Sequence, residues 1–255
     1  MIAKTVRTEA KTMLKVTIYN EGVHEKSEQR IAEVYPEGIH GQLKKVLSDE
    51  FEVTTYTLET VEEITEEVLR NTDVLLWWGH MAHHKVPDEV AERVRDAVHG
   101  GMGLIVLHSG HHSKPFKLLM GTKCNLLWRC NGDFERVWKI KPAHPIAQGI
   151  GDFIYLEHEE VYGEPFGIPD PDEVVFISSF EGGEVFRSGC CYTRELGKIF
   201  YFQPGHESYP TYYNEEIIKV IKNAINWAYS PYRSDRGIDS RHIKIPTTVL
   251  EDVKG

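Results

Sequence analysis

Histidines follow three strand-like segments of this sequence, and imidazole is the side chain best suited to proton transfer and metal binding near neutral pH. The segments 73–79, 103–107 and 198–205 are rich in apolar residues, and the next residue is in each case a histidine: His80, His108 and His206. Ligands of open α/β sheets bind where parallel strands end, so we expect the three rings to share one pocket.

Three protein ligands and an open fourth position are typical of a catalytic zinc ion. His80, His108 and His206 supply that number, and we predict that they bind one divalent metal ion, with zinc favoured. No HExxH or similarly spaced motif occurs, so this prediction rests on placement in the fold. The alternative is a metal-free polar pocket in which the histidines bind hydroxyl groups and one acts as a general base. No nucleotide cofactor is expected.

Other polar side chains lie close to the same strand ends or in the acidic segment 159–162. His206 and Glu207, at the end of the last strand, are predicted catalytic residues. The residues expected to contact the substrate are Asn20, Glu21, His24, His83, His111, His112 and Tyr162. Trp128 and Tyr162 are expected in irregular segments, where an aromatic ring can stack on a sugar. Ser109 allows another reading, a serine hydrolase with His206 as base and Glu207 as its orienting group.

Alternating strand and helix patterns predict the scaffold that positions these residues. Strands are expected at 14–20, 51–57, 74–78, 104–107 and 198–202, with helices at 39–47, 62–70, 87–98, 114–120 and 215–228. A strand that is apolar throughout, such as 74–78, is typical of a sheet covered on both faces. We therefore predict a doubly wound, mostly parallel α/β sheet flanked by helices, with an antiparallel β elaboration at about 124–194.

Length and charge narrow the class of protein. The chain of 255 residues suits one large domain, which we expect at 13–230 between a flexible extension at 1–12 and a tail at 231–255. A net charge of −10 disfavours nucleic acid and anionic membranes as partners. The start of the chain is too polar for a signal peptide and the four cysteines lack paired spacing, so we expect a cytoplasmic protein with reduced thiols.

Four segments in this order resemble the ThuA-like family, named for trehalose utilisation. They are 103–110 (GLIVLHSG), 144–150 (HPIAQGI), 159–162 (EEVY) and 197–201 (GKIFY), the last running into Gly205 and His206. The family pattern has Asp-Glu-Leu-Tyr where this chain has Glu-Glu-Val-Tyr, which keeps two carboxylates beside a tyrosine. The resemblance to this motif implies that Glu160 is the proton-transfer group, with His206 and Glu207 as its catalytic partners. The resemblance, spread over residues 15–229, implies a fold similar to class I glutamine amidotransferases and to flavodoxin.

The resemblance also implies an enzyme of carbohydrate catabolism. We expect a hydrolase, lyase or isomerase that acts on a sugar or keto-sugar derivative by acid–base chemistry, with metal assistance. The alternatives are the Ser109 hydrolase and a non-catalytic protein that binds sugar or regulates the pathway. Glutamine amidotransferase activity is not expected, because the turn after the fourth strand holds His108, Ser109 and Gly110 instead of a cysteine nucleophile. The expected partners are a small carbohydrate and further copies of the chain.

Overall fold

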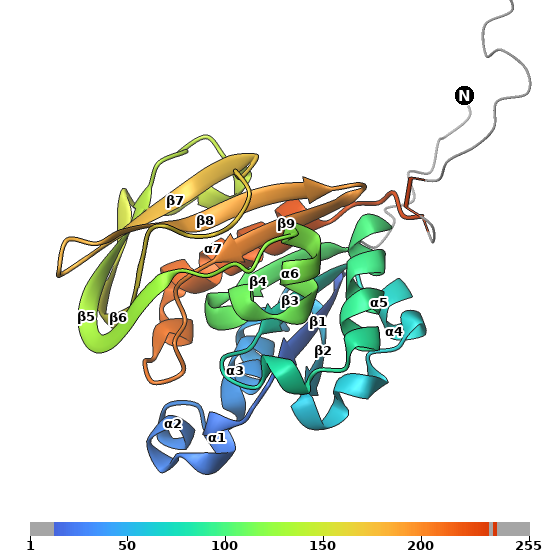
Figure 1. The fold of residues 1–255 in the computed structure, drawn as a ribbon, viewed down its shortest axis with the longest axis horizontal. Coiled ribbons are helices and arrows are strands. Elements are labelled where there is room, and N and C mark those ends of the chain that lie inside the picture. The colour runs from blue at the N-terminus through green and yellow to red at the C-terminus, as the bar shows by residue number, and fades with distance from the viewer. Residues whose placement is uncertain (1–12, 235–236, 239–255) are drawn as a thin grey trace, which may run out of the picture.

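Five parallel strands form one side of a nine-stranded sheet in the computed structural model, which describes residues 13–234, 237 and 238 (Figure 1). Their order is β2-β1-β3-β4-β9, with each neighbouring pair parallel. They are β1 (Lys15–Asn20), β2 (Glu52–Thr57), β3 (Val74–Trp78), β4 (Gly103–Leu107) and β9 (Gly197–Phe202). The chain reverses its winding beside β1, which confirms the predicted doubly wound topology.

Four antiparallel strands extend this sheet beyond β9, in the order β8-β7-β5-β6. They are β5 (Leu127–Lys139), β6 (Phe153–Gly163), β7 (Glu173–Phe180) and β8 (Val185–Arg194). The expectation that Trp128 and Tyr162 lie in irregular segments was wrong, because they pair across β5 and β6. The last five residues of β6 are all buried, so they lack the alternation that identifies a half-exposed strand.

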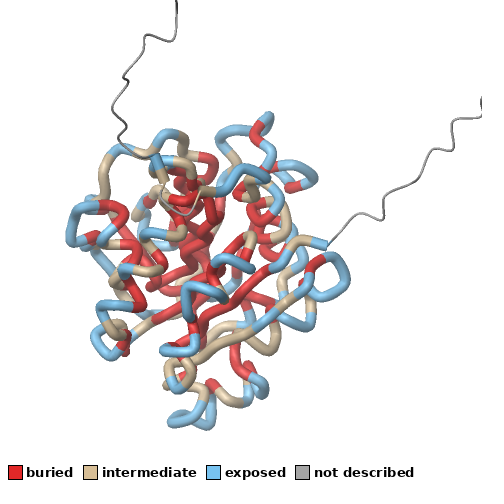
Figure 2. Tube along the Cα trace, turned by 90° about the vertical axis from the view of Figure 1, so that its right-hand side faces the viewer, coloured by how far each residue is buried: buried red, intermediate tan, exposed pale blue. Residues whose placement is uncertain are grey.

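Helices cover both faces of the parallel strands, and the buried interior in Figure 2 lies between these layers. Ile39 of α3 (Gly38–Leu47) and Ile221 of α7 (Glu215–Ala228) pack on one face with Leu76 of β3. Val94 of α5 (Asp88–His99) packs on the other with Leu75. The α4 (Glu66–Arg70) and α6 (Lys114–Met120) helices contribute to this second cluster. Adjacent strand residues face opposite layers, as an internal strand requires.

Short helices fill the connections between the main elements. They are α1 (His24–Ser27), α2 (Gln29–Val34), and the 3-10 turns η1 (Leu58–Glu63), η2 (His83–Lys85), η3 (His108–His112), η4 (Pro145–Ala147) and η5 (Thr211–Tyr213). The helix expected at 62–70 is instead η1 followed by α4. The Thr65 side chain accepts a hydrogen bond from the backbone of Val68 and so begins a new helix.

The predicted extension at 1–12 and most of the predicted tail at 231–255 lie outside the described residues. Within the described part of the chain, no helix is long and apolar enough to cross a membrane.

Two turns after the parallel strands have unusual backbone angles. His108, directly after β4, has φ 49°, a region that a residue with a side chain rarely occupies. Gly205, after β9, has φ 135°, and a Cβ atom there would collide with the hydroxyl of Tyr212. Only glycine therefore fits the turn that delivers His206 and Glu207 to the edge of the sheet.

Candidate functional site

The loops after β1, β3, β4 and β9 bring histidines together at the carboxyl edge of the parallel strands. Ring centroids lie 5.2 Å apart for His80 and His206, 5.3 Å for His108 and His206, and 6.4 Å for His80 and His108. His24, after β1, lies 5.2 Å from His80. Four separate crossovers thus contribute imidazoles to one cluster, as expected where parallel strands end.

A buried ion pair joins β4 to β6. Nε2 of His108 lies 3.0 Å from a carboxylate oxygen of Glu160, and Nδ1 donates to the carbonyl of Gln203 at 2.8 Å. Because both nitrogens face acceptors, His108 is an imidazolium. Burial disfavours this charge, but the hydrogen bond and charge of Glu160 outweigh it and raise the pKa of His108 above 6.5. The same pairing outweighs burial at Glu160 and lowers its pKa.

Glu207 holds two histidines with one oxygen. Nδ1 of His24 lies 2.5 Å, and Nδ1 of His80 2.6 Å, from Oε1 of Glu207. Burial alone would raise the pKa of Glu207, but the hydrogen bonds from the two rings outweigh it and hold the pKa far below 4.5. Glu207 is therefore ionised, and both Nδ1 atoms point at its charge.

His206 differs from His24 and His80, because its Nδ1 atom accepts a hydrogen bond instead of facing a carboxylate. The backbone N–H of Ser208 donates to Nδ1 of His206 at 3.1 Å, so the proton of the neutral ring is on Nε2. Burial lowers the pKa of His206 to about 4, and the nearby charge of His108 acts in the same direction. Near neutral pH, His206 therefore presents an N–H donor toward the cluster instead of a lone pair.

A cavity of about 430 Å³ opens beside this cluster. Glu160, Tyr162 and Trp128 of the β5–β6 pair form one wall; the other lining residues are His80, Ser109, His111, His112, Asn125 and Leu126. The indole of Trp128 is 68% exposed, which leaves its face free to stack on a ligand. The size is within the roughly 300–1,000 Å³ usual for small-molecule sites.

Ser109 does not form the relay expected of a serine hydrolase. Its hydroxyl shares a 2.8 Å hydrogen bond with the hydroxyl of Tyr162, which in turn lies 3.4 Å from Nε2 of His108. In the described part of the chain, no hydrogen bond joins Ser109 to His206. Tyr162 therefore links the serine to the imidazolium of His108, which cannot accept a proton.

Two predicted substrate residues support the loops instead of lining the cavity. The carboxylate of Glu21 accepts hydrogen bonds from the backbone of Met81 at 2.9 Å and Ala82 at 3.0 Å, which holds the loop that carries His80. The amide of Asn20 donates to Glu25 at 2.7 Å and lies 3.0 Å from Nδ1 of His40. These contacts fix the turn after β1.

Of the remaining predicted histidines, His111 and His112 line the cavity, whereas His83 does not. Nδ1 of His111 donates to the carbonyl of Cys124 at 2.8 Å, and burial lowers its pKa well below 6.5. Burial also lowers the pKa of His83 to about 3, and its ring lies 6.3 Å from that of His112. Burial lowers the pKa of His112 as well, so the three rings are neutral near pH 7, and those of His111 and His112 form part of the cavity wall.

Glu159 is a site residue that sequence reasoning missed. Its carboxylate accepts hydrogen bonds from the backbone of Gly205 and His206, both at 3.0 Å, and from the hydroxyl of Thr211 at 2.7 Å. Burial raises its pKa above 4.5. Neighbouring acids on a strand point to opposite faces, so treating 153–163 as a strand would have separated the roles of Glu159 and Glu160.

Two groups of donor atoms are close enough to hold a metal ion among the described residues. One is His24, His80 and Glu207; the other is His80, Glu160 and His206. Neither contains His108, because its nitrogens are occupied by Glu160 and Gln203. The predicted metal site of His80, His108 and His206 therefore stays a prediction, and the contacts of His108 do not favour it.

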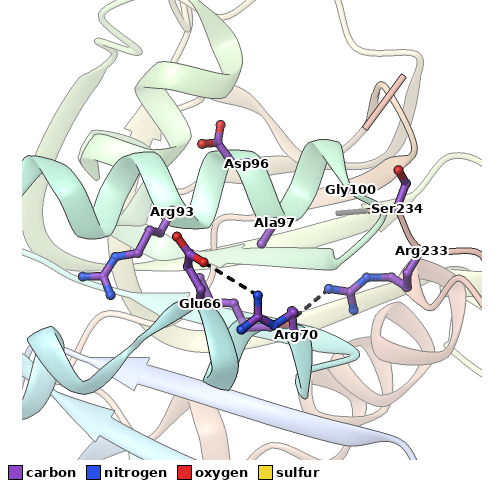
Figure 3. A pocket seen from close by; sticks show the side chains of 9 residues that line it. Glu66, Arg70, Arg93, Asp96, Ala97, Gly100, Arg233 and Ser234 are labelled. Atoms are coloured by element: carbon purple, nitrogen blue, oxygen red, sulfur yellow. Dashed lines mark hydrogen bonds and ion pairs between the residues drawn. The ribbon is translucent and has the colours of Figure 1, made fainter. Parts of the chain in front are cut away.

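A separate cavity of about 400 Å³ lies between α4 and α5, away from the histidines (Figure 3). Glu66 and Arg70, one turn apart on α4, form an ion pair at 3.7 Å along one of its walls. Arg233 donates to the carbonyls of Thr72 at 2.6 Å and Leu69 at 3.2 Å, which caps the end of α4. None of the predicted site residues lines this cavity.

Solved structures similar to this chain support the fold. A ThuA-like protein from Parabacteroides merdae is 13% identical with a TM-score of 0.64, covering 88% of this chain and 92% of that one. A cytoplasmic protein from Salmonella typhimurium is 14% identical, with a TM-score of 0.56 and coverages of 87% and 100%. A protein from Thermoplasma acidophilum described as part of a GMP synthase is 13% identical, with a TM-score of 0.55 and coverages of 85% and 94%.

These likenesses confirm the predicted amidotransferase-like fold, and at such low identity they show the fold alone. No curated protein matches the sequence. The family prediction was tested directly: residues 15–228 match the family model ThuA, described as trehalose utilisation. The chain therefore belongs to the ThuA family.

Proposed function

We propose that this protein is a carbohydrate lyase or isomerase that removes a proton from the carbon beside the carbonyl group of a keto sugar. The observation that carries the proposal is the setting of Glu160, a carboxylate that lines the cavity although only 3% of the residue is exposed. Its ion pair with His108 keeps it charged and fixes its direction. A carboxylate that is ionised and fixed beside a cavity is placed to accept a proton from a bound substrate.

The reaction needs a base and a donor, and the site has both. Glu160 takes the proton from carbon, and the electron pair of the C–H bond forms a C=C bond while the carbonyl oxygen becomes an enolate. His206 donates from Nε2 to that oxygen, as a neutral imidazole does in sites that stabilise enolates. In an isomerisation, protonated Glu160 returns the proton to the former carbonyl carbon, while the hydroxyl proton of the carbon that lost the first proton passes to the enolate oxygen, so that C=O forms at that carbon. In an elimination, the enolate electrons re-form C=O and move the C=C bond one carbon along, the C–O bond to the substituent on the next carbon breaks, and protonated Glu160 gives its proton to the departing oxygen.

The substrate class follows from the family and the cavity wall. The family description, trehalose utilisation, favours an oxidised glucose disaccharide as the first substrate to test. Trp128 offers an exposed aromatic face to a sugar ring, and the histidines of the wall offer donors and acceptors to hydroxyl groups. Fold alone does not define chemistry, so the test must measure the proton transfer itself.

Deuterium exchange measures this step without knowledge of the final product. The protein is incubated in D₂O with keto derivatives of glucose disaccharides, and NMR follows loss of the C–H signal beside the carbonyl. We expect exchange with the wild type and a decrease of about 10²–10⁴-fold in Glu160→Gln. Glu157→Gln changes an exposed acid of the same strand and serves as the matched control. Binding without any exchange would show a sugar-binding module and contradict the proposal.

The proposal includes a cytoplasmic location and self-association. The Salmonella protein of similar fold is described as cytoplasmic. Trp138, Phe153 and Tyr155 expose between 38% and 49% of their surface on the β5–β6 edge of the sheet, where a second copy could cover them. Sedimentation of the purified protein should give the mass of an oligomer, and a monomer at working concentrations would contradict this part.

A further inference from the structure

Two imidazoles and one carboxylate meet at a point that the proposed proton transfer does not use. Nδ1 of His24 lies 2.5 Å and Nδ1 of His80 2.6 Å from Oε1 of Glu207. The two nitrogen atoms are 3.4 Å apart. Three donor atoms from the loops after β1, β3 and β9 therefore converge within the space that one ion occupies.

The carboxylate of Glu207 also lacks a partner for its second oxygen. The side chain is 1% exposed, and Oε2 is buried without a hydrogen bond among the described residues. Nε2 of His206 is 3.9 Å from it, which is too far for a hydrogen bond. A buried, unpaired carboxylate oxygen costs free energy unless a cation completes its surroundings.

The distances between the three donor atoms are close to those around a transition-metal ion. With about 2.0–2.1 Å from zinc to each donor, a tetrahedral site places its donor atoms roughly 3.3–3.4 Å apart. The two Nδ1 atoms already have this separation. The carboxylate must move outward by less than about 1 Å, which a small rotation of the side chain provides.

The surroundings of His24 and His80 match those of an open metal site. The side chains of His24 and His80 are 18% and 24% exposed, whereas Glu207 is buried, so a further coordination position faces solvent beside the cavity that His80 lines. Nε2 of His24 lies 3.7 Å from a carboxylate oxygen of Glu28, which can orient the second nitrogen of a bound ring.

The second donor group is less suitable. Nδ1 of His206 accepts a hydrogen bond from the backbone of Ser208, so Nε2 could bind an ion only if its proton moved to Nδ1 and that hydrogen bond were lost. Glu160 is already paired with the charged ring of His108. An ion in that group would have to break both interactions, whereas an ion bound by His24, His80 and Glu207 replaces only the hydrogen bonds between those residues.

We propose that His24, His80 and Glu207 bind one divalent transition-metal ion, with zinc as the probe, through two Nδ1 atoms and one carboxylate. Two imidazoles and a carboxylate form a ligand set that zinc uses in catalytic sites. The open position would take a hydroxyl oxygen of the sugar, a role that rests on the proposed function. This inference goes beyond the proposed function, since ion binding is measured without any reaction.

The test measures zinc bound to the full-length protein. Chelator-treated protein is dialysed against excess zinc and then against metal-free buffer, and the metal content is measured by mass spectrometry. We expect one zinc ion per wild-type chain, and a loss of at least about 10–100-fold in affinity in His24→Ala and Glu207→Gln. Glu160→Gln and His206→Ala should retain the ion. His84→Ala, an exposed histidine of the loop after β3, is the matched control.

Circular dichroism of each variant separates loss of the ion from loss of folding. If Glu207→Gln does not fold, His24→Ala still tests the site, because the His24 side chain is partly exposed. A wild type without stoichiometric zinc would overturn the proposal. So would a result in which Glu160→Gln loses the ion and His24→Ala keeps it, because the second donor group would then be the site. Deuterium exchange is a separate readout, so failure of either proposal is visible by itself.

Discussion

Glu159 of β6 holds the turn that carries His206, because its carboxylate accepts the backbone N–H of His206 at 3.0 Å. The next residue, Glu160, faces the cavity and pairs with His108 at 3.0 Å. One dipeptide therefore supplies both a carboxylate that positions a donor and a carboxylate that we propose to react. This division follows from the strand, whose successive side chains point to opposite faces.

Replacing Glu159 should destabilise the fold and misplace His206. Glu159→Ala leaves the N–H groups of Gly205 and His206 without an acceptor, and each unsatisfied buried donor costs about 1–3 kcal/mol. We expect the free energy of unfolding, measured by urea denaturation, to fall by about 3 kcal/mol. Glu159→Gln keeps one acceptor oxygen and should recover part of this loss, together with part of the deuterium exchange. Wild-type stability in Glu159→Ala would contradict the role.

Replacing His206 should slow the chemical step more than it weakens binding. His206→Ala removes the Nε2 donor that we propose for the enolate oxygen, and loss of one such donor lowers kcat by about 10²–10³-fold. The KM of the keto sugar should change much less, because the carbonyl of the ground state carries less charge than the enolate. A variant with unchanged kcat and a raised KM would show that His206 only binds substrate.

The aromatic wall offers a test of sugar binding. Trp128→Ala removes an exposed ring that lines the cavity, so we expect about a 10-fold increase in KM with little change in kcat. Stability should change by less than about 0.5 kcal/mol, because the side chain is on the surface. Trp138→Ala, on the same strand but away from the cavity, is the control and should leave KM unchanged. Equal effects of the two substitutions would exclude stacking on Trp128.

The sequence predicted the parallel core because its signals are local. The apolar run 74–78 and the spacing of Val90, Val94 and Val98 identify a strand and a helix without any knowledge of their neighbours. The topology then brings the strand-end histidines to one edge. The resemblance to the ThuA family, tested against residues 15–228, was also correct.

The pairing of side chains in the site was beyond such reasoning. Whether His108 meets Glu160 or a metal depends on the positive φ of His108 and on the register of β6 against β5, and neither has a local signature. The same holds for Glu207, which meets His24 across 183 positions of sequence. Pairings of this kind are set by the packed structure, so sequence analysis could gather the candidates but could not assign their partners.

The cysteines give a test of burial that is independent of the proposed chemistry. Cys130 is exposed, whereas Cys124, Cys190 and Cys191 are buried, and burial raises the pKa of Cys190 to about 12. The reactive thiolate is therefore scarce at the buried positions. We expect one fast-reacting thiol per native chain with a disulfide reagent, and none in Cys130→Ser. Denaturation should expose all four cysteines of the sequence. Rapid reaction of more than one native thiol would contradict the burial of the other three cysteines.

The ion pair of Glu164 and Arg187 predicts how stability changes with pH. Oε1 of Glu164 accepts from Nε of Arg187 at 2.7 Å, and Oε2 from its terminal nitrogen at 2.9 Å. Burial opposes ionisation of Glu164, but these hydrogen bonds outweigh it and hold its pKa below 4.5. A carboxyl group whose pKa is lower in the folded than in the unfolded state stabilises the fold above its unfolded pKa. That contribution is lost as pH falls through the folded pKa.

We therefore expect Glu164→Gln to be less stable than the wild type at about pH 7, with the difference shrinking below about pH 4.5. Denaturation curves measured at both ends of this range test the prediction, with the exposed Glu157→Gln as control. Other carboxyl groups titrate in the same window, but they do so in both proteins, so the difference between the two curves isolates Glu164. A stability difference that stays constant with pH would contradict the prediction. It would mean that the bidentate pair contributes equally whether Glu164 is charged or neutral.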